Sequence, residues 1–281
     1  MDFGNTPVTF PSDTLSTDQE PEAPKMGLQA IIFDVDGTVA ETADLHRAAF
    51  NRAFQEQGIN WHWDREIYSQ LAPVEFSLPK LRLFAAATRR SGQCDTPGHQ
   101  DIAKIAARKA QIYCNLMREG RARLRPGVAR LMKEARHEGL LLGAVSTSSR
   151  AETQALLTAT LGFHGMGWFS VLKTSENAKL QGAERSLYQA VLDEFGLKGR
   201  QAIAIEDSPS GAAAAAECDI PVLATPSLYT ASNHFNMAAL TVSDLGQPVE
   251  PFTVINGEPD GATFVSPSML RSISKPKAAA A

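Results

Sequence analysis

The stretch LQAIIFDVDGT, residues 28–38, joins an apolar run of strand length to a polar turn. An apolar run without polar alternation is typical of a strand that is buried on both faces, as in a parallel sheet. Two later runs have the same form, LLLGAV at 140–145 followed by STSS, and AIAI at 202–205 followed by EDS. Each of the three predicted strands therefore ends in side chains that can do chemistry.

Helical patterns follow the predicted strands. Apolar residues recur at helical spacing after Pro126-Gly127 and again before Phe195-Gly196. Strands that alternate with helices in this way predict a right-handed parallel α/β sheet of Rossmann-like form, in which ligands bind at the carboxyl ends of the strands. The apolar positions are Val128, Leu131, Met132, Ala135, Leu187, Ala190, Val191 and Leu192.

The segment between the first two predicted strands has only helical periodicity. In residues 45–120 apolar side chains repeat three and four positions apart, with a stop at Gly58. We therefore predict a helical cap at 45–120, inserted into an α/β core that is formed by residues 27–44 and 121–245.

The two ends of the chain have too few apolar residues to form a core of their own. Residues 1–26 are polar and acidic and include four prolines, so we expect a flexible arm. Residues 246–281 are rich in Pro, Gly, Ser and Ala. We expect them to form a largely irregular, mobile tail, in which residues 252–255 could add an edge strand.

Composition limits the classes of partner. The 281 residues carry 27 Lys and Arg against 31 Asp and Glu, a net charge of −4, without a basic block; this argues against nucleic acid as a partner. No apolar run reaches the ~18 residues that a membrane span needs, and no signal-peptide pattern is present. Three cysteines without a C-x-x-C pair indicate a reducing compartment. We expect a cytoplasmic monomer whose partner is a small anionic molecule.

Four carboxylates follow the first and third predicted strands: Asp34, Asp36, Glu206 and Asp207. If the strands are neighbours, these groups converge at one sheet edge and shift one another's pKa unless a cation is present. Carboxylate oxygens suit Mg²⁺, so the sequence predicts a Mg²⁺ site. Asp34 and Asp36 are two residues apart and share one side of an extended strand, so one can attack while the other transfers protons. Taken alone, the Asp-Gly pair could be a plain turn, but the second acidic pair favours the metal site.

The DVDGT segment resembles the first motif of the haloacid dehalogenase superfamily of phosphotransferases. Ser146 stands at the place of the second motif, EDSPSG at 206–211 stands at that of the fourth, and the likeness spans residues 28–245. In the cap and near the C-terminus the chain is similar to the xylulose-1,5-bisphosphate phosphatases, which are relatives of β-phosphoglucomutase. The residues that carry this closer likeness are Ala40-Glu41-Thr42, Leu45-His46, Ala49-Phe50-Asn51, Trp61-His62-Trp63-Asp64-Arg65, Tyr229-Thr230 and Phe235.

The resemblance implies roles for the four carboxylates. Asp34 would attack a phosphate monoester and form an aspartyl phosphate. Asp36 would protonate the departing oxygen and then deprotonate the hydrolytic water. Mg²⁺ would be held by the Asp34 side chain, the Asp36 main-chain carbonyl and Asp207, with Glu206 beside them.

The resemblance also implies residues that bind the substrate. Ser146 would donate a hydrogen bond to a phosphoryl oxygen, and main-chain N–H groups around Val35, Gly37 and Thr147 could do the same. Taken alone, the STSS segment would be a helix N-cap. Glu41 and His46 follow the first motif and could face the substrate, although a histidine there is as often a surface or packing residue.

The chain departs from the family at the third motif, a lysine that pairs with the phosphoryl group and the nucleophile. Its expected position, counted back from Tyr188, is Gly182. A shifted loop could let Lys179 reach the site on its long side chain and complete the catalytic set. The alternative is that Lys179 is a solvated loop residue and that the enzyme is impaired.

The cap loop that binds the far end of the substrate in the relatives also differs. Residues 72–80 include two prolines that stiffen the loop, and Glu75 would repel a second phosphate. Lys80 is a candidate substrate-binding residue in this loop, and Arg82 or Arg89-Arg90 could offer an alternative clamp. The substrate of the relatives is therefore not simply inherited.

These features favour a Mg²⁺-dependent phosphatase that hydrolyses a small sugar-phosphate-like metabolite through an aspartyl phosphate. Two alternatives remain open. One is a pseudo-enzyme that binds a phosphorylated metabolite or a protein partner, and the other is a sugar phosphomutase. A short basic patch at Arg121, Arg123 and Arg125 is not part of any of these functions, and a solvated face is its default interpretation.

Overall fold

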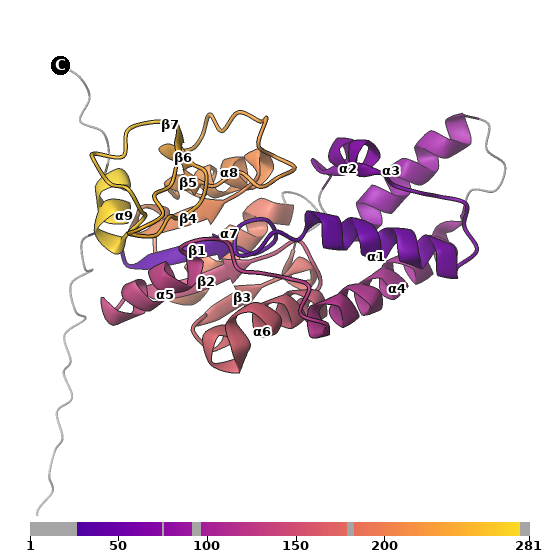
Figure 1. Cartoon of the computed structure of the whole chain (residues 1–281), viewed down its shortest axis with the longest axis horizontal. Helices are drawn as coiled ribbons and strands as arrows, with labels where there is room; N and C mark the ends of the chain where they lie inside the picture. Colours follow the sequence, from indigo (N-terminus) through magenta and orange to yellow (C-terminus); the bar gives the residue numbers. More distant parts are fainter. Residues whose placement is uncertain (1–26, 75, 92–96, 179–182, 276–281) are drawn as a thin grey trace, which may run out of the picture.

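The computed structural model describes residues 27–74, 76–91, 97–178 and 183–275. The strands of this part form one seven-stranded sheet in the order β3-β2-β1-β4-β5-β6-β7 (Figure 1). Every pair of neighbours is parallel except β6 and β7. The predicted parallel α/β core is confirmed. The strands are β1 (Ala30–Asp34), β2 (Leu141–Val145), β3 (Val171–Lys173), β4 (Ala202–Glu206), β5 (Val222–Ala224), β6 (Leu240–Val242) and β7 (Val254–Asn256).

Helices cover both faces of the sheet, which is why its central strands are apolar throughout. On one face Ile31 and Phe33 of β1 pack in the cluster that includes helices α5 (Val128–His137) and α6 (Arg150–Met166). On the other face Ala30 and Ile32 pack with α7 (Ala183–Phe195) and α8 (Pro209–Ala216). Alternate residues of one strand thus enter two different cores. Short 3₁₀ turns, Ser175–Asn177 and Gly199–Gln201, precede α7 and β4.

The cap lies between β1 and β2 in the chain, as predicted, and occupies one end of the molecule (Figure 1). Its helices are α1 (Ala43–Glu56), α2 (Arg65–Leu71), α3 (Ser77–Arg90) and α4 (His99–Arg118). Aromatic rings fill the space between α1, α2 and α3, with Trp63 at the centre against Phe50, Phe54 and Phe84. Helix α4 packs both on α1 and on α6 of the core, so it joins the two parts.

The C-terminal segment contains two short regular elements. Of the predicted edge-strand residues 252–255, Val254 and Ile255 belong to β7, which pairs with β6. Helix α9 (Pro267–Ile273) then packs on α5, and its Met269 and Leu270 are buried. The few apolar residues of this segment are spaced to fall on one helix face, a pattern that its Pro, Ser and Gly content conceals. The predicted N-terminal arm, residues 1–26, lies outside the described residues.

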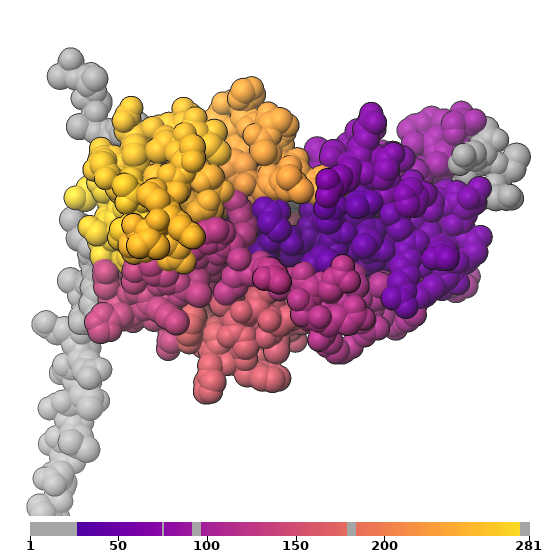
Figure 2. Space-filling view, viewed as in Figure 1, coloured from indigo at the N-terminus to yellow at the C-terminus, as the bar shows by residue number. Residues whose placement is uncertain are grey.

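In the described ranges the molecule has no helix that combines the length and the apolar character of a membrane span. Figure 2 shows the surface hollowed where the core meets the cap.

Candidate active site

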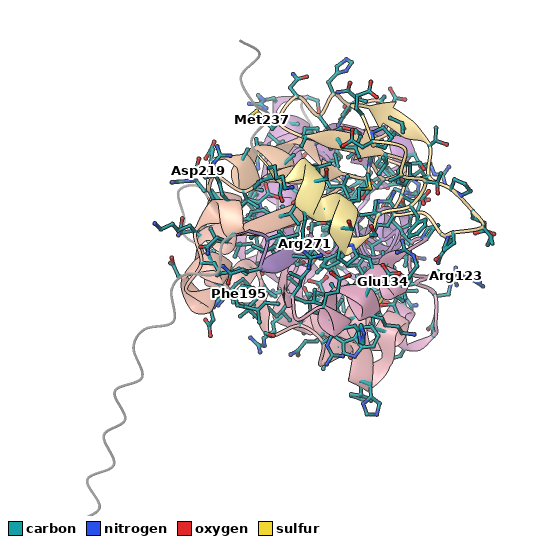
Figure 3. The ribbon with its side chains drawn as sticks, turned by 90° about the vertical axis from the view of Figure 1, so that its left-hand side faces the viewer. Arg123, Glu134, Phe195, Asp219, Met237 and Arg271 are labelled. Atoms are coloured by element: carbon teal, nitrogen blue, oxygen red, sulfur yellow. The ribbon has the colours of Figure 1, made fainter. Side chains whose placement is uncertain are left out.

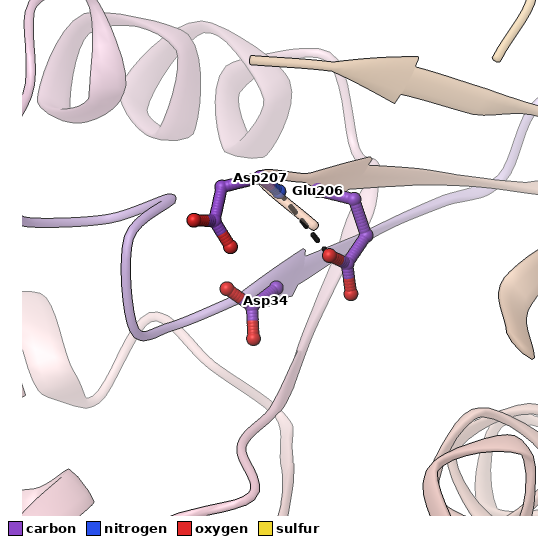
Figure 4. Close-up of side chains that lie close together, drawn as sticks. All are labelled: Asp34, Glu206 and Asp207. Atoms are coloured by element: carbon purple, nitrogen blue, oxygen red, sulfur yellow. Dashed lines mark hydrogen bonds between the residues drawn. The ribbon is translucent and has the colours of Figure 1, made fainter. Parts of the chain in front are cut away.

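The acidic site forms because β1 and β4 are neighbours in parallel register, with Phe33 opposite Ile205. Their carboxyl ends therefore meet, and Asp34, Glu206 and Asp207 converge there with carboxylate oxygens within 4.8 Å of one another (Figure 4). We call these three residues the acidic cluster. The Asp207 main-chain N–H donates to Glu206 Oε2 at 3.2 Å, the bond drawn in the figure.

Two glycines make room for the acidic cluster. A Cβ at Gly37 would lie 2.2 Å from Asp207 Oδ2, and a Cβ at Gly211 would lie 2.1 Å from Glu206 Oε1. Gly37 also has a φ of 94°, which side-chain-bearing residues rarely adopt. The first and fourth motifs therefore need these glycines to bring carboxylates and backbone together.

The carboxylates of the acidic cluster are buried close together, and the Arg125 charge, which lowers the pKa of Asp207, offsets only part of the effect of burial. Burial, and then repulsion from Glu206, Asp207 and Asp36, raises the pKa of Asp34 well above its ordinary value. Burial and Asp207 raise the pKa of Glu206 to about 8, and burial raises the pKa of Asp207 to about 7. One oxygen of Asp34, Oδ2, has no hydrogen-bond partner in the described structure.

This donor set fits Mg²⁺. The three carboxylates supply hard oxygen ligands. Asp34 Oδ2 is buried without a hydrogen-bond partner in the described structure, which indicates a place for a cation. A divalent ion would also remove the repulsion that raises these pKa values. Asp34, Glu206 and Asp207 are the side chains that would hold the ion. The Asp36 carboxylate is not among them, because its oxygens are turned to other partners.

Asp36 accepts hydrogen bonds from four side chains: Thr42 Oγ1 at 2.9 Å, His46 Nε2 at 2.8 Å, Ser146 Oγ at 3.0 Å and the Tyr113 hydroxyl at 3.4 Å. Burial by itself would raise the pKa of Asp36, but the interaction with His46 and the hydrogen bonds of nearby hydroxyls outweigh burial and hold it well below its usual range. Asp36 is therefore ionised in the free protein.

A buried network of charged groups continues from Asp36 into the cap. Lys109 Nζ lies 2.7 Å from His46 Nδ1 and 2.8 Å from Glu152 Oε1. Because the lysine has only donors, Nδ1 of His46 accepts and Nε2–H donates to Asp36. Lys109 and Glu152 are 2% and 3% exposed, and their opposite charges compensate each other in this setting. Asp36, His46, Lys109 and Glu152 are called the charge network below.

Further contacts within the core and within the cap fix the charged side chains of this network. Glu152 also closes the capping box of α6 with Ser149, whose Oγ donates to its Oε2 at 2.7 Å. Lys109 Nζ lies over the rings of Phe50 and Tyr113 at 4.9 and 5.3 Å. Burial and the Lys109 charge lower the pKa of His46. His46 and Lys109 of the cap thus contact Asp36 and Glu152 of the core.

Neither Lys109 nor Glu152 was predicted from the sequence as a site residue. A signal was present for the lysine: it lies four residues after Ile105 and three before Ile112, on the apolar face of a helix. A lysine at such a position needs a buried counter-charge. Its partner, 43 residues away, could not be read from spacing.

The pocket above the acidic cluster has a volume of about 150 Å³. Of the predicted substrate-binding residues, Gly37, His46, Thr147 and Lys80 line it, and Ser148 lies beside Thr147. Lys80 reaches it from the cap and also donates to the Val74 carbonyl. In the described part of the chain, the lysines that line the pocket are Lys80 and Lys109, and both belong to the cap.

Among the described residues, two of the predicted catalytic and substrate-binding residues do not line the pocket. Ser146 directs its hydroxyl at Asp36 and does not line the pocket. Glu41 is turned away from the pocket, toward Arg125 and the Leu228 N–H, because the linker reverses direction after Gly37. Lys179 lies outside the described residues.

The comparisons with known proteins agree with this architecture. Residues 28–219 match the family model of haloacid dehalogenase-like hydrolases. The chain belongs to this family, and it is a phosphatase. Protein CbbY of Cupriavidus necator is 36% identical over 224 residues, which cover 80% of this chain and 88% of that protein. Protein CbbY of Rhodobacter capsulatus is 34% identical over 220 residues, 78% and 95% of the two chains.

Solved structures show the same likeness. The crystal structure of CbbY from Rhodobacter sphaeroides in complex with phosphate has a TM-score of 0.72 at 33% identity, covering 77% of this chain and 94% of that one. A variant of that protein, in complex with xylulose-(1,5)bisphosphate, has a TM-score of 0.72 at 32% identity over the same shares.

Proposed function

We propose that this chain is a Mg²⁺-dependent phosphatase that hydrolyses a small sugar-phosphate-like metabolite through an aspartyl phosphate on Asp34. The observation that carries the proposal is the buried Asp34 carboxylate at the base of the pocket, with an unpartnered oxygen beside two further acidic groups. Such a group is costly unless a cation and a reacting phosphoryl group occupy the site.

The first step forms a bond between an Asp34 oxygen and the phosphorus. The bond to the sugar oxygen breaks at the same time, and that oxygen takes a proton from Asp36. Asp36 is ionised in the free protein, but a phosphoryl group carrying negative charge nearby raises its pKa and so favours the protonated form. Mg²⁺, when bound, neutralises charge on the phosphoryl oxygens.

The second step returns the enzyme to its starting state. A water molecule attacks the phosphorus and gives its proton to Asp36, the bond to Asp34 breaks, and inorganic phosphate leaves. The low pKa of Asp36 restores the proton to solvent afterwards. Main-chain N–H groups of the Gly37 and Thr147 turns can bind phosphoryl oxygens throughout.

His46 and Lys109 act as positioning residues in this scheme. His46 donates from α1 of the cap to Asp36 of the core, and Lys109 sets the tautomer that allows this. The acid/base group is therefore correctly held when the cap contacts the core. This couples closure over a substrate to the proton transfer.

The pocket supports a sugar phosphate of modest size. A relative binds xylulose-(1,5)bisphosphate, and Lys80 on the cap wall is placed to contact the far end of a substrate here. Glu184 lines the same pocket and disfavours a second phosphate near it. We propose a sugar monophosphate as the better substrate.

The test is release of inorganic phosphate from a panel of sugar mono- and bisphosphates, including xylulose-1,5-bisphosphate, with and without Mg²⁺. We expect Mg²⁺-dependent release that is lost in Asp34→Asn, and also in Lys179→Ala if the displaced lysine completes the site. Formation of an isomer without free phosphate would identify a phosphomutase instead. Tight binding of the whole panel without any turnover would contradict the proposal and support a binding protein.

A further inference from the structure

A second cavity, of about 420 Å³, lies at the hinge between core and cap. Residues 35–42 link β1 to α1 and residues 119–127 link α4 to α5, and the two linkers pair with each other through Ala40 and Leu124. The Arg125 N–H also donates to the Val39 carbonyl at 2.9 Å. Both linkers, together with the segment after β6, form the cavity walls. The residues that matter here are Glu41, Arg121, Arg123, Arg125, Ser243 and Asp244.

Two arginines of this cavity have uncompensated charges. Arg121 and Arg123 are exposed on either side of the buried Ala122, so their side chains leave the same side of an extended segment. Within the described residues neither side chain makes an ion pair or a hydrogen bond. Figure 3 shows Arg123 projecting from the edge of the molecule.

The carboxylates of the same cavity already have donors. Asp244 accepts from Ser243 Oγ at 2.9 Å and from the Gly246 N–H at 2.7 Å. Glu41 lies 3.6 Å from Arg125 Nε and accepts from the Leu228 N–H. They therefore hold the cavity walls together, and among the described residues neither carboxylate forms an ion pair with Arg121 or Arg123.

We propose that this hinge cavity is a second anion site, in which Arg121 and Arg123 bind a small phosphorylated molecule. Guanidinium groups form paired hydrogen bonds with phosphate oxygens, and an anion between two like charges relieves their repulsion. The volume suits a small metabolite and exceeds that of a lone ion.

The cavity is connected to the catalytic site through Arg125. This buried arginine lines the cavity and donates to the carbonyls of Gly37 and Thr225. Gly37 lies against Asp207, as its close approach to that carboxylate shows. An anion held by Arg121 and Arg123 thus lies two residues from the arginine that contacts the back of the catalytic turn, and it lies at the hinge of the cap. The effect on turnover rests on the proposed function, whereas the binding does not.

The test follows the arginine Nε–H resonances of the full chain by NMR during a titration with inorganic phosphate, compared with sodium chloride at equal ionic strength. We expect the resonances of Arg121 and Arg123, assigned from single Arg→Gln variants, to shift and saturate with phosphate. We expect the resonance of the exposed Arg200 to follow ionic strength alone. In R121Q/R123Q the saturable response at the hinge should weaken at least tenfold, whereas R200Q should leave it unchanged.

Identical responses to phosphate and chloride at Arg121 and Arg123 would overturn the second site and leave a solvated basic face. Because the arginine resonances report on the hinge alone, an inactive enzyme that still shows saturation would refute the proposed function and keep the site. An active phosphatase whose Arg121 and Arg123 resonances do not saturate with phosphate would refute the second site and keep the proposed function. Both arginines are exposed, and equal melting temperatures of wild type and variants would show that folding is intact.

Discussion

Asp34 and Asp36 are two residues apart on one turn, yet the protein treats their charges in opposite ways. Asp34 belongs to the acidic cluster, where burial and neighbouring carboxylates raise its pKa. Asp36 belongs to the charge network, where hydrogen bonds and His46 hold its pKa down in spite of burial. The acidic cluster needs a cation from solution, whereas in the charge network Lys109 compensates Glu152 and hydrogen bonds hold the charge of Asp36.

This difference separates two tasks that chemistry on a phosphate ester requires. A nucleophile must hold its charge next to an anionic substrate, and a bound cation makes this possible. An acid/base group must change its protonation state, so it needs partners that can move with the cap. The two aspartates are chemically identical, and their surroundings assign the tasks.

The largest effect is expected from Asp34→Asn. Loss of the nucleophile should lower kcat by about 10⁴-fold or more and abolish trapping of a phosphorylated protein. The same substitution removes repulsion among the buried carboxylates, so the metal-free variant should melt at a higher temperature than wild type. The measurements are steady-state kinetics, phosphoenzyme trapping and calorimetry.

Asp36→Asn serves as the matched variant. It should lower the melting temperature, because it disrupts the hydrogen bonds to Thr42, His46 and Ser146. If Asp34→Asn and Asp36→Asn changed the melting temperature in the same direction, the two aspartates would not differ in charge compensation as described.

Lys109→Met is expected to destabilise the fold by about 3–5 kcal/mol, because it leaves the buried Glu152 without a counter-charge. Adding Glu152→Gln to this variant should recover a large part of the loss. Urea denaturation measures the free energy of unfolding. Lys104→Met, an exposed lysine of the same helix, is the control and should change stability by less than about 0.5 kcal/mol. A double variant whose loss equals the sum of the two single losses would argue against a compensated pair.

Mg²⁺ is expected to stabilise the protein more at about pH 8 than at about pH 5. The pKa values of Glu206 and Asp207 are about 8 and about 7 in the folded protein, above the ~4 of an unfolded chain. Between these values the folded protein binds more protons, so the metal-free protein loses stability as pH rises. Mg²⁺ reverses this loss at high pH, and protons compete with it at low pH.

A hundredfold excess of Mg²⁺ over its Kd gives about 2.7 kcal/mol, or roughly 5–10 °C in Tm at the higher pH. Thermal melts with Mg²⁺ and with EDTA measure the shift. An equal shift at both pH values would contradict the acidic cluster as the binding site.

The smallest effect is expected from His46→Gln. Without the histidine the pKa of Asp36 should rise, because a main cause of its lowered value is gone. Asp36 must be protonated to act as an acid in the first step, so the basic limb of the pH profile of kcat should then move upward by about one pH unit, with retention of fold. His137→Gln, on the exposed face of α5, is the control. An unchanged basic limb would show that Asp36 is not the titrating group.

Much of the fold could be predicted because its signals are local. The apolar runs at 28–33, 140–145 and 202–205 became the neighbouring strands β1, β2 and β4, and helical spacing identified the cap. The C-terminal helix α9 was missed because it has only a few apolar residues. The contact of Glu41 with Arg125 could not be predicted, since a side chain's direction after a turn depends on packing. Lys109 was not predicted to line the pocket, since its position there depends on how the cap packs on the core.

The sequence by itself determined the fold class and the place where Asp34, Asp36, Glu206 and Asp207 gather, because parallel strands bring their carboxyl ends to one edge of a sheet. Only the tertiary structure decided which of these carboxylates is compensated. The partners of the charge network lie 63 and 43 residues apart in the chain, and the cap must close on the core before they meet. Charge compensation in a buried site depends on distances of a few ångströms, and contacts between remote segments set those distances.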